Sequence, residues 1–190
     1  MKRITFTLLL ILFFVNSQSQ SIYGQTDYIF GTMVNRTDTL VGYFSFDKQI
    51  TQNGQTVYYV PGPGSGRIKT FQSRKYDYFQ GDSIYMEKFG GYPALGGMVD
   101  VLIPRVIDGR IQLFELKFNW GPMNLAKSDR FFVKKGTEKF SIKRKKFKEQ
   151  MRTLISENID LLNKIESGEL TFDDMIKVIL MYNNKDYPVQ

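Results

Sequence analysis

The sequence predicts an α+β fold: an antiparallel β-barrel or β-roll made of hairpins, followed by about three C-terminal α-helices. The first observation is a series of short runs, up to residue 142, that are rich in β-branched and aromatic residues and separated by turn residues. The second is a change to helical periodicity from about Arg144. Strands that come first and helices that come last are typical of an α+β domain. We therefore expect a β-rich domain over residues 20–142 and a helical segment over residues 143–190 that packs on it.

The first hairpin is expected over residues 28–34 and 39–46, on either side of the polar turn 35–38. Gly42 interrupts the second run. A glycine inside a strand indicates a bend or a close approach of another backbone segment, so we expect one of these at Gly42.

The middle of the chain predicts short strands between two glycine-rich loops. Asn53-Gly54 is a tight-turn pair before a strand at 56–60. Residues 61–66 contain two prolines, which offer no donor to a strand ladder, and predict a surface loop. Residues 90–97 predict a second loop. The intervening strands are expected at 67–71, 75–79 and 83–89, with a turn at 80–82.

Two more hairpins complete the predicted sheet. Residues 99–107 and 110–118 surround Asp108-Gly109, which suits a type I′ turn. In the second arm the apolar residues Phe114, Leu116 and Phe118 alternate with Leu113, Glu115 and Lys117, which predicts one buried and one solvent-facing side. The last hairpin is expected at 130–133 and 139–142, with its turn at 135–136.

The C-terminal segment predicts three helices. Apolar residues with helical spacing define each of them: first Phe147, Met151, Leu154 and Ile155; then Ile159, Leu161, Leu162 and Ile165; then Met175, Ile176, Ile179 and Tyr182. We expect Ser156 to cap the second helix and Gly168 to end it. Thr171 and Asp174 have the spacing of a capping box before the third.

The first nineteen residues have the order of a secretory signal. A basic start (Met1-Lys2-Arg3) precedes an apolar run at 4–15 and a small, polar stretch at 16–19. The apolar run has twelve residues, whereas a membrane-spanning helix needs about 20, so cleavage near Ser19 is expected and an uncleaved anchor is the alternative. We expect an exported protein, periplasmic or extracellular, with no transmembrane span after cleavage.

The composition excludes several kinds of chemistry. The chain has no cysteine and no histidine. It therefore has no disulfides, no thiolate metal site, no lipid-modified cysteine and no histidine base or ligand. We expect no cofactor, no metal site and no catalytic residue, although carboxylate catalysis stays open.

Basic residues are concentrated in one segment. The net charge is +7, and removal of Lys2 and Arg3 leaves +5. Nine cations lie between residues 134 and 152, opposed only by Glu138 and Glu149. The alternatives are a solvated hairpin and helix face, or a site for an anionic lipid or glycan surface or for an envelope protein; export argues against nucleic acid. The candidate interaction residues are Lys134, Lys135, Lys143, Arg144, Lys145, Lys146, Lys148 and Arg152.

Three other candidate sites are weaker. The glycine-rich loop 61–66 lies between strands, whereas a phosphate-binding loop precedes a helix. A hydrolase would need two converging carboxylates. The candidates in the strand-rich part are Asp77, Asp82, Glu87, Asp100 and Glu115. Asp82, like Asp108, lies in an expected turn, and Glu115 lies on an expected solvent-facing side. A glycan-binding platform could use exposed aromatic rings, and the candidates are Tyr76, Tyr78, Phe79, Tyr85 and Trp120.

Several short motifs, in this order, resemble a family of uncharacterised secreted proteins from Bacteroidetes. They are Tyr28-Ile29 with 38–43 (DTLVGY), 67–71 (RIKTF), 108–114 (DGRIQLF), 131–135 (FFVKK), 146–147, 173–176 and 182–183. The resemblance implies a small β-barrel or β-roll with a C-terminal helical cap, and no activity. Many relatives have two cysteines near the tail, and this chain has none.

Together these observations predict a secreted, non-enzymatic envelope protein that interacts with a protein partner or an anionic surface. A glycan-binding module and, less favoured, a carboxylate-based hydrolase are the alternatives.

Overall fold

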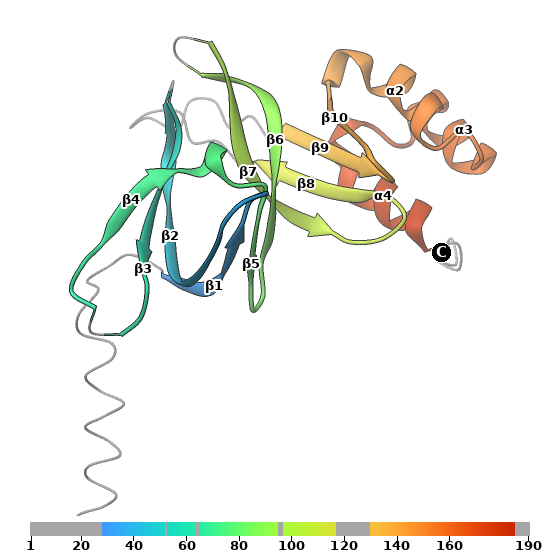
Figure 1. Ribbon diagram of the computed structural model, residues 1–190. Helices are drawn as coiled ribbons and strands as arrows, with labels where there is room; N and C mark the ends of the chain where they lie inside the picture. The colour runs from blue at the N-terminus through green and yellow to red at the C-terminus, as the bar shows by residue number, and fades with distance from the viewer. Residues whose placement is uncertain (1–27, 52, 64, 95–96, 117–129, 185–190) are drawn as a thin grey trace, which may run out of the picture.

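The computed structural model describes residues 28–51, 53–63, 65–94, 97–116 and 130–184. Ten strands form one sheet in the order β10-β9-β8-β7-β6-β5-β1-β2-β3-β4, and the paired strands are antiparallel. The sheet curls into a half-barrel, and three helices follow it along the chain (Figure 1). The predicted α+β fold with a β-barrel-like sheet is therefore confirmed. The strands are β1 Ile29–Val34, β2 Thr39–Thr51, β3 Gly54–Val60, β4 Lys69–Gln72, β5 Tyr78–Gly81, β6 Tyr85–Ala94, β7 Gly97–Ile107, β8 Gln112–Leu116, β9 Arg130–Lys135 and β10 Glu138–Ile142.

The first hairpin forms as its turn chemistry predicts. The side-chain oxygen of Asn35 accepts hydrogen bonds from the backbone N–H groups of Thr37 and Asp38, at 2.9 and 2.7 Å. Asparagine at this position stabilises a turn because its side chain replaces a backbone acceptor. Gly42 also has its expected role, since a Cβ there would lie 2.5 Å from the carbonyl oxygen of Val60.

Three turn or strand predictions were wrong. Residues 73–75 form a short 3-10 helix, η1 (Ser73–Lys75), so β5 begins only at Tyr78. The expected loop at 90–97 mostly continues β6 and β7, whose pairing shifts register between Phe89 and Tyr92. The turn at Asp108-Gly109 is wider than a two-residue type I′ turn, because the last β7–β8 pair is Ile107 with Leu113. The second prediction failed because glycine residues are found inside bulged strands as well as in loops.

Two apolar clusters lie on opposite faces of β7. Leu102 belongs to a cluster with Met33, Phe44 and Phe79 inside the curl of the first strands. Its neighbours Val101 and Ile103 belong to another cluster, which includes Phe89, Phe114 and Phe132. Successive residues of a strand point to opposite faces, so the middle of this sheet is covered on both sides.

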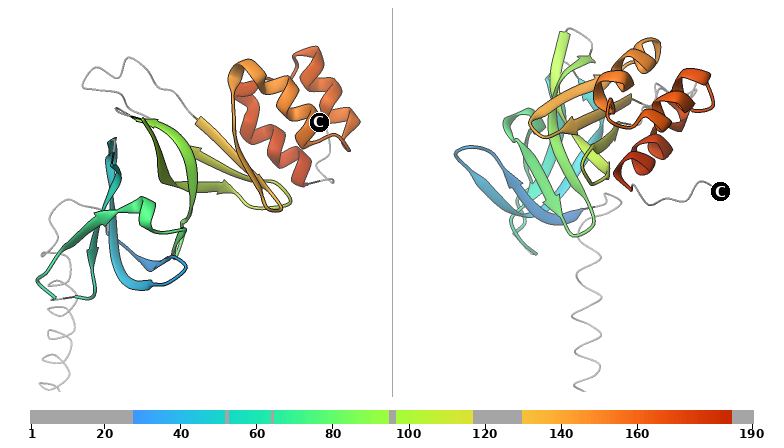
Figure 2. Two further views of the ribbon diagram at one scale, coloured as in Figure 1. Left: turned by 45° about the horizontal axis from the view of Figure 1, so that its top comes forward. Right: turned by 90° about the vertical axis from the view of Figure 1, so that its right-hand side faces the viewer.

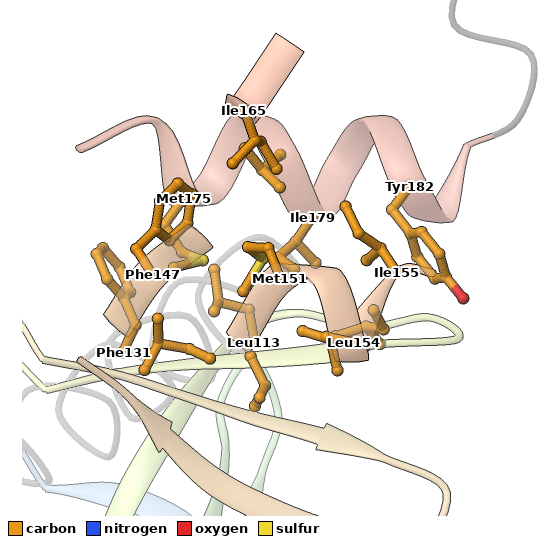
Figure 3. Close-up of a cluster of buried hydrophobic side chains, with 14 of the residues drawn as sticks. Leu113, Phe131, Phe147, Met151, Leu154, Ile155, Ile165, Met175, Ile179 and Tyr182 are labelled. Carbon is orange, nitrogen blue, oxygen red and sulfur yellow. The ribbon is translucent and has the colours of Figure 1, made fainter. Parts of the chain in front are cut away.

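The three helices cover the far end of the sheet and supply the third cluster. They are α2 Phe147–Leu154, α3 Ile159–Ser167 and α4 Met175–Asn183, with the 3-10 helices η2 Arg144–Lys146 before α2 and η3 Phe172–Asp174 before α4. Met151, Ile155, Ile165 and Ile179 are completely buried in this cluster, which also contains Leu113 of β8 (Figure 3). The helices lie at the end of the molecule away from β1–β4 (Figure 2).

The helix ends follow the predicted signals with one exception. Gly168 ends α3 in a left-handed conformation with φ +84°, and Asp174 accepts a hydrogen bond from the N–H of Thr171 at 2.9 Å as part of a capping box. The cap of α3 is Asn158, whose side chain accepts from the N–H of Leu161, and not Ser156. On the helix surfaces Ile159 and Ile176 are exposed, although the helical spacing predicts both on apolar faces.

The prediction of a solvent-facing side on β8 was also wrong. Leu113 faces the helices, and Phe114 and Leu116 face the central cluster. Glu115 is only 7% exposed. The helical segment covers the face that Glu115 and Leu113 share, which the alternation within one strand could not reveal. Phe118 and Lys117 lie outside the described residues.

Candidate interaction surface

The basic segment spans the β9–β10 hairpin, η2 and α2. In α2 the inward positions are taken by Phe147, Met151 and Leu154, so the basic residues of this helix lie on its outer side. All three residues of η2 are exposed. The structure therefore brings the predicted cations to the surface of the helical end of the molecule, but it gives them different surroundings.

Lys134 belongs to a half-buried ion cluster that the sequence did not indicate. Its Nζ lies 2.8 Å from Oε1 and 3.0 Å from Oε2 of Glu87, and the Nζ of Lys139 lies 2.5 Å from the same carboxylate. The side chain of Glu87 is only 8% exposed. Burial alone would raise the pKa of Glu87, but the hydrogen bonds from the two lysines outweigh burial and lower it.

This cluster shows how strongly the sheet is curled. Glu87 is on β6 and Lys134 on β9, which are three positions apart in the strand order. Beside them the ring of Tyr85 lies under Arg105, whose guanidinium carbon is 4.4 Å from the ring centroid. Burial, followed by the charge of Glu87, raises the pKa of Tyr85 to about 12.

Lys135 joins the hairpin to the helices. Its Nζ donates to the carbonyl oxygen of Leu154 at 2.7 Å and to the carboxylate of Glu157 at 3.1 Å. The hydroxyl of Tyr182 donates to the same carboxylate. Hydrogen bonds from Tyr182 and Lys135 lower the pKa of Glu157 to about 2. Lys135 therefore stabilises the docking of α4 and is not a free cation.

Arg144 and Arg152 form ion pairs with acidic residues of the helical segment. Arg144 donates to both carboxylate oxygens of Asp173, at 2.7 and 2.6 Å. Arg152 makes a similar two-bond contact with Glu166, at 2.7 and 2.9 Å. These hydrogen bonds lower the pKa of each carboxyl group. Both arginine side chains are 60% or more exposed, so each pair lies at the surface.

Four exposed lysines have no carboxylate oxygen closer than 4.0 Å among the residues that the structure describes. Lys148 donates to the carbonyl oxygen of Glu166 at 2.8 Å, and the Nζ of Lys146 lies 4.0 Å from Glu149. Lys143 and Lys145 have no ion pair with any residue that the structure describes. We call these four residues, which fall within six consecutive positions, the exposed lysine cluster; its members are Lys143, Lys145, Lys146 and Lys148.

A second set of cations was missed. No aspartate or glutamate occurs from residue 48 to residue 76, whereas five cations do. Arg67, Lys69, Arg74 and Lys75 are exposed, and within the described part of the chain none of them has an ion pair. We call these four the edge cations, because they lie on and beside β4. The long stretch without acidic residues was the signal that could have identified them.

Most of the carboxylates considered for hydrolysis have structural partners or lie in turns, and Asp100 is exposed on β7. Asp77 pairs with Lys88 at 2.5 Å, and Glu87 has the lowered pKa described above, which is the opposite of what a general acid needs. Glu115 is buried, and Asp82 follows β5 in a turn. Asp108 accepts from the N–H of Gly109. Among the residues that the structure describes, no group of three acidic side chains could hold a metal ion.

The aromatic candidates do not form one exposed platform. Tyr76 and Phe79 are 7% and 0% exposed and belong to the core. Tyr78 and Tyr85 are half-buried and stack with a centroid distance of 6.0 Å. Trp120 lies outside the described residues.

A hollow of about 530 Å³ lies where α3 begins, beside the Lys135–Glu157 contact. Asn158 and Asp160 supply polar atoms, and Ile159 and Tyr182 supply apolar surface. Its acidic character does not complement the anionic partner expected for the basic segment.

Comparisons of the chain with models of known families, with curated proteins and with solved structures find no match. In the described parts of the chain, no helix has the length and apolar character needed to span a membrane.

Proposed function

We propose that the chain is an exported, non-enzymatic protein that binds a phosphate-bearing envelope surface through the exposed lysine cluster. One observation carries the proposal: four exposed ammonium groups lie within six residues, and among described residues the nearest carboxylate oxygen is 4.0 Å away, between Lys146 and Glu149. Apart from this long Lys146–Glu149 contact the four lysines have no ion pair among the described residues, so they can approach a new anion without giving up a close carboxylate.

Export is supported by the order of the first nineteen residues. A non-enzymatic role is supported by the absence of cysteine and histidine from the whole chain. The lowered pKa of Glu87 adds to this support, because a carboxyl group that acts as a general acid needs a raised pKa.

The expected strength follows from the number of lysines. Each cation close to an anionic membrane contributes about 1 kcal/mol, which is a factor of about 5 in affinity. Four well-placed lysines would contribute a factor of several hundred at most, on the order of 4 kcal/mol. Because the end of a protein is curved, not every lysine reaches a flat membrane surface at the same time. We therefore expect the affinity for the membrane to fall about tenfold or more when all four charges are removed.

The test uses the exported, processed protein and vesicles of phosphatidylcholine with or without phosphatidylglycerol. Co-sedimentation at low and high salt measures binding, which should need the anionic lipid and should weaken in salt. Replacement of the exposed lysine cluster by glutamine should abolish most of the binding. Replacement of the four edge cations by glutamine is the matched control, since it removes the same charge from the other end of the molecule (Figure 2).

Two results would contradict the proposal. Failure of the unaltered protein to bind anionic vesicles at low salt would exclude a phosphate-bearing lipid surface as the partner. An equal loss in both four-residue variants would mean that net charge, and not this cluster, determines binding.

A further inference from the structure

The free edge of β4 is a second surface with its own recognition chemistry. β4 is the last strand in the sheet order and pairs with β3 through four residue pairs, from Thr56 with Gln72 to Tyr59 with Lys69. Within the described residues no strand lies on its other side. In an antiparallel strand every second residue directs its N–H and C=O groups toward that open side, so β4 offers backbone hydrogen bonds to an added strand.

The side chains along this edge are open to solvent. Arg67, Ile68, Lys69 and Thr70 are all exposed, and Ile68 is 55% exposed. The segment just before the strand therefore presents one large apolar side chain between two cations. An incoming strand could cover Ile68 while it pairs with the backbone of β4.

Charge distinguishes among the possible occupants of this edge. The edge cations Arg67, Lys69, Arg74 and Lys75 have no ion pair with the described residues, and the sequence around them contains no acidic residue from 48 to 76. Lysine on an edge strand discourages pairing with neutral or basic strands. It favours a strand that carries carboxylates, because opposite charges across a strand pair are stabilising.

The same charges disfavour a second copy of this chain. Antiparallel pairing of two β4 edges would bring Arg67 and Lys69 of one copy close to those of the other. Like charges across a strand pair are destabilising. We propose that the β4 edge binds an extended, acidic segment of a partner protein by strand addition.

This surface is independent of the exposed lysine cluster. The β4 edge and the helices lie at opposite ends of the molecule in Figure 1 and in the left view of Figure 2. The protein could thus hold an acidic partner segment at one end while the other end contacts an envelope surface, and each interaction can fail without the other.

The probe is a fluorescently labelled peptide that alternates valine and glutamate, titrated with the exported, processed protein and followed by fluorescence anisotropy. We expect saturable binding and slower hydrogen exchange at every second amide of Lys69–Gln72, where the N–H faces the open side. Glutamine at all four edge cations should weaken binding about tenfold, the combined effect of several weak surface charge contacts. Glutamine at the four residues of the exposed lysine cluster should leave the affinity unchanged.

A second peptide separates strand addition from simple charge attraction. It has the same sequence with every backbone nitrogen methylated, which keeps the charges and removes the hydrogen-bond donors. We expect this peptide to bind at least about tenfold more weakly, since a strand ladder needs those donors. The proposal is overturned if the first peptide does not bind, if the methylated peptide binds equally well, or if both four-residue variants lose the same affinity. Circular dichroism of each variant confirms that it is folded.

Discussion

Replacement of Glu87 by glutamine tests the buried ion cluster. The change keeps the size and shape of the side chain and removes only its charge. Glu87 is 8% exposed and accepts hydrogen bonds from Lys134 at 2.8 and 3.0 Å, with Lys139 at 2.5 Å. The lysines themselves are 27% and 34% exposed, so water can partly replace the lost partner.

The expected cost follows from these contacts. Hydrogen bonds to charged groups contribute about 1.5–3 kcal/mol, and removal of one partner from a fully buried pair costs about 3–5 kcal/mol. Because the lysines are partly hydrated and glutamine can still accept one hydrogen bond, we expect the free energy of unfolding at neutral pH to fall by about 2 kcal/mol. For a chain of this size that lowers the melting temperature by about 4–8 °C.

The pH dependence of this loss has a definite sign. The folded state lowers the pKa of Glu87 below its ordinary value of 4.5. The charged side chain therefore contributes its stabilisation fully above pH 4.5, and the contribution is lost as pH falls through the lowered folded value. The difference in stability between the unaltered protein and the Glu87→Gln variant should narrow in that acidic range.

Urea denaturation of both proteins at several pH values measures this difference. The Glu166→Gln variant is the control, because its partner Arg152 is 60% exposed and a surface pair of this kind contributes about 0–1 kcal/mol. A Glu87→Gln variant as stable as the control at neutral pH would refute the reasoning. So would a stability difference that stays constant through the acidic range.

Three further changes test the helical end. Asn183→Ala removes the hydrogen bonds that join α4 to Ile111, at 2.9 and 2.8 Å, and should lower the free energy of unfolding in urea by about 1–3 kcal/mol; an unchanged midpoint would contradict this role. Gly168→Ala places a side chain at φ +84° and should cost about 1 kcal/mol, whereas Gly62→Ala, at a site with open space, should be neutral in the same assay. Met151→Ala should cost about 2–5 kcal/mol in thermal unfolding because Met151 is fully buried, and a loss below about 1 kcal/mol would mean that the cluster repacks.

The sequence predicted those features that depend on neighbouring residues. Asn35 in a turn, Gly168 at a helix end and the Thr171–Asp174 spacing act over a few residues, and each has its expected role in the structure. The α+β order of elements likewise follows from local periodicity.

Features that depend on distant contacts could not be predicted in this way. Glu115 lies on a strand face that the helices cover, although its own strand alternates as a half-exposed strand would. Gly90 and Gly91 indicated a loop, but β6 continues through them as a bulged strand. In both cases the partner that determines the structure lies elsewhere in the chain.

The same limit applies to the candidate site. Nine cations in nineteen residues formed the strongest charge signal, but their partners Glu87, Asp173 and Glu166 come from other elements. A count of basic residues along the segment therefore overestimates how many cations are available to bind a partner. The edge cations are sparser in sequence, and within the described residues they have no ion pair.

The distinction between paired and exposed lysines is the central claim, and lysine footprinting tests it most directly. A limiting amount of an N-hydroxysuccinimide ester acetylates the exported, processed protein, and mass spectrometry gives the rate at each lysine, with and without phosphatidylglycerol vesicles. We expect Lys143 and Lys145 to react fastest and Lys134 and Lys139 slowest, and the vesicles to protect the exposed lysine cluster while Lys69 and Lys75 stay reactive. Equal rates at Lys134 and Lys145, or equal protection of Lys75 and Lys145, would contradict the account.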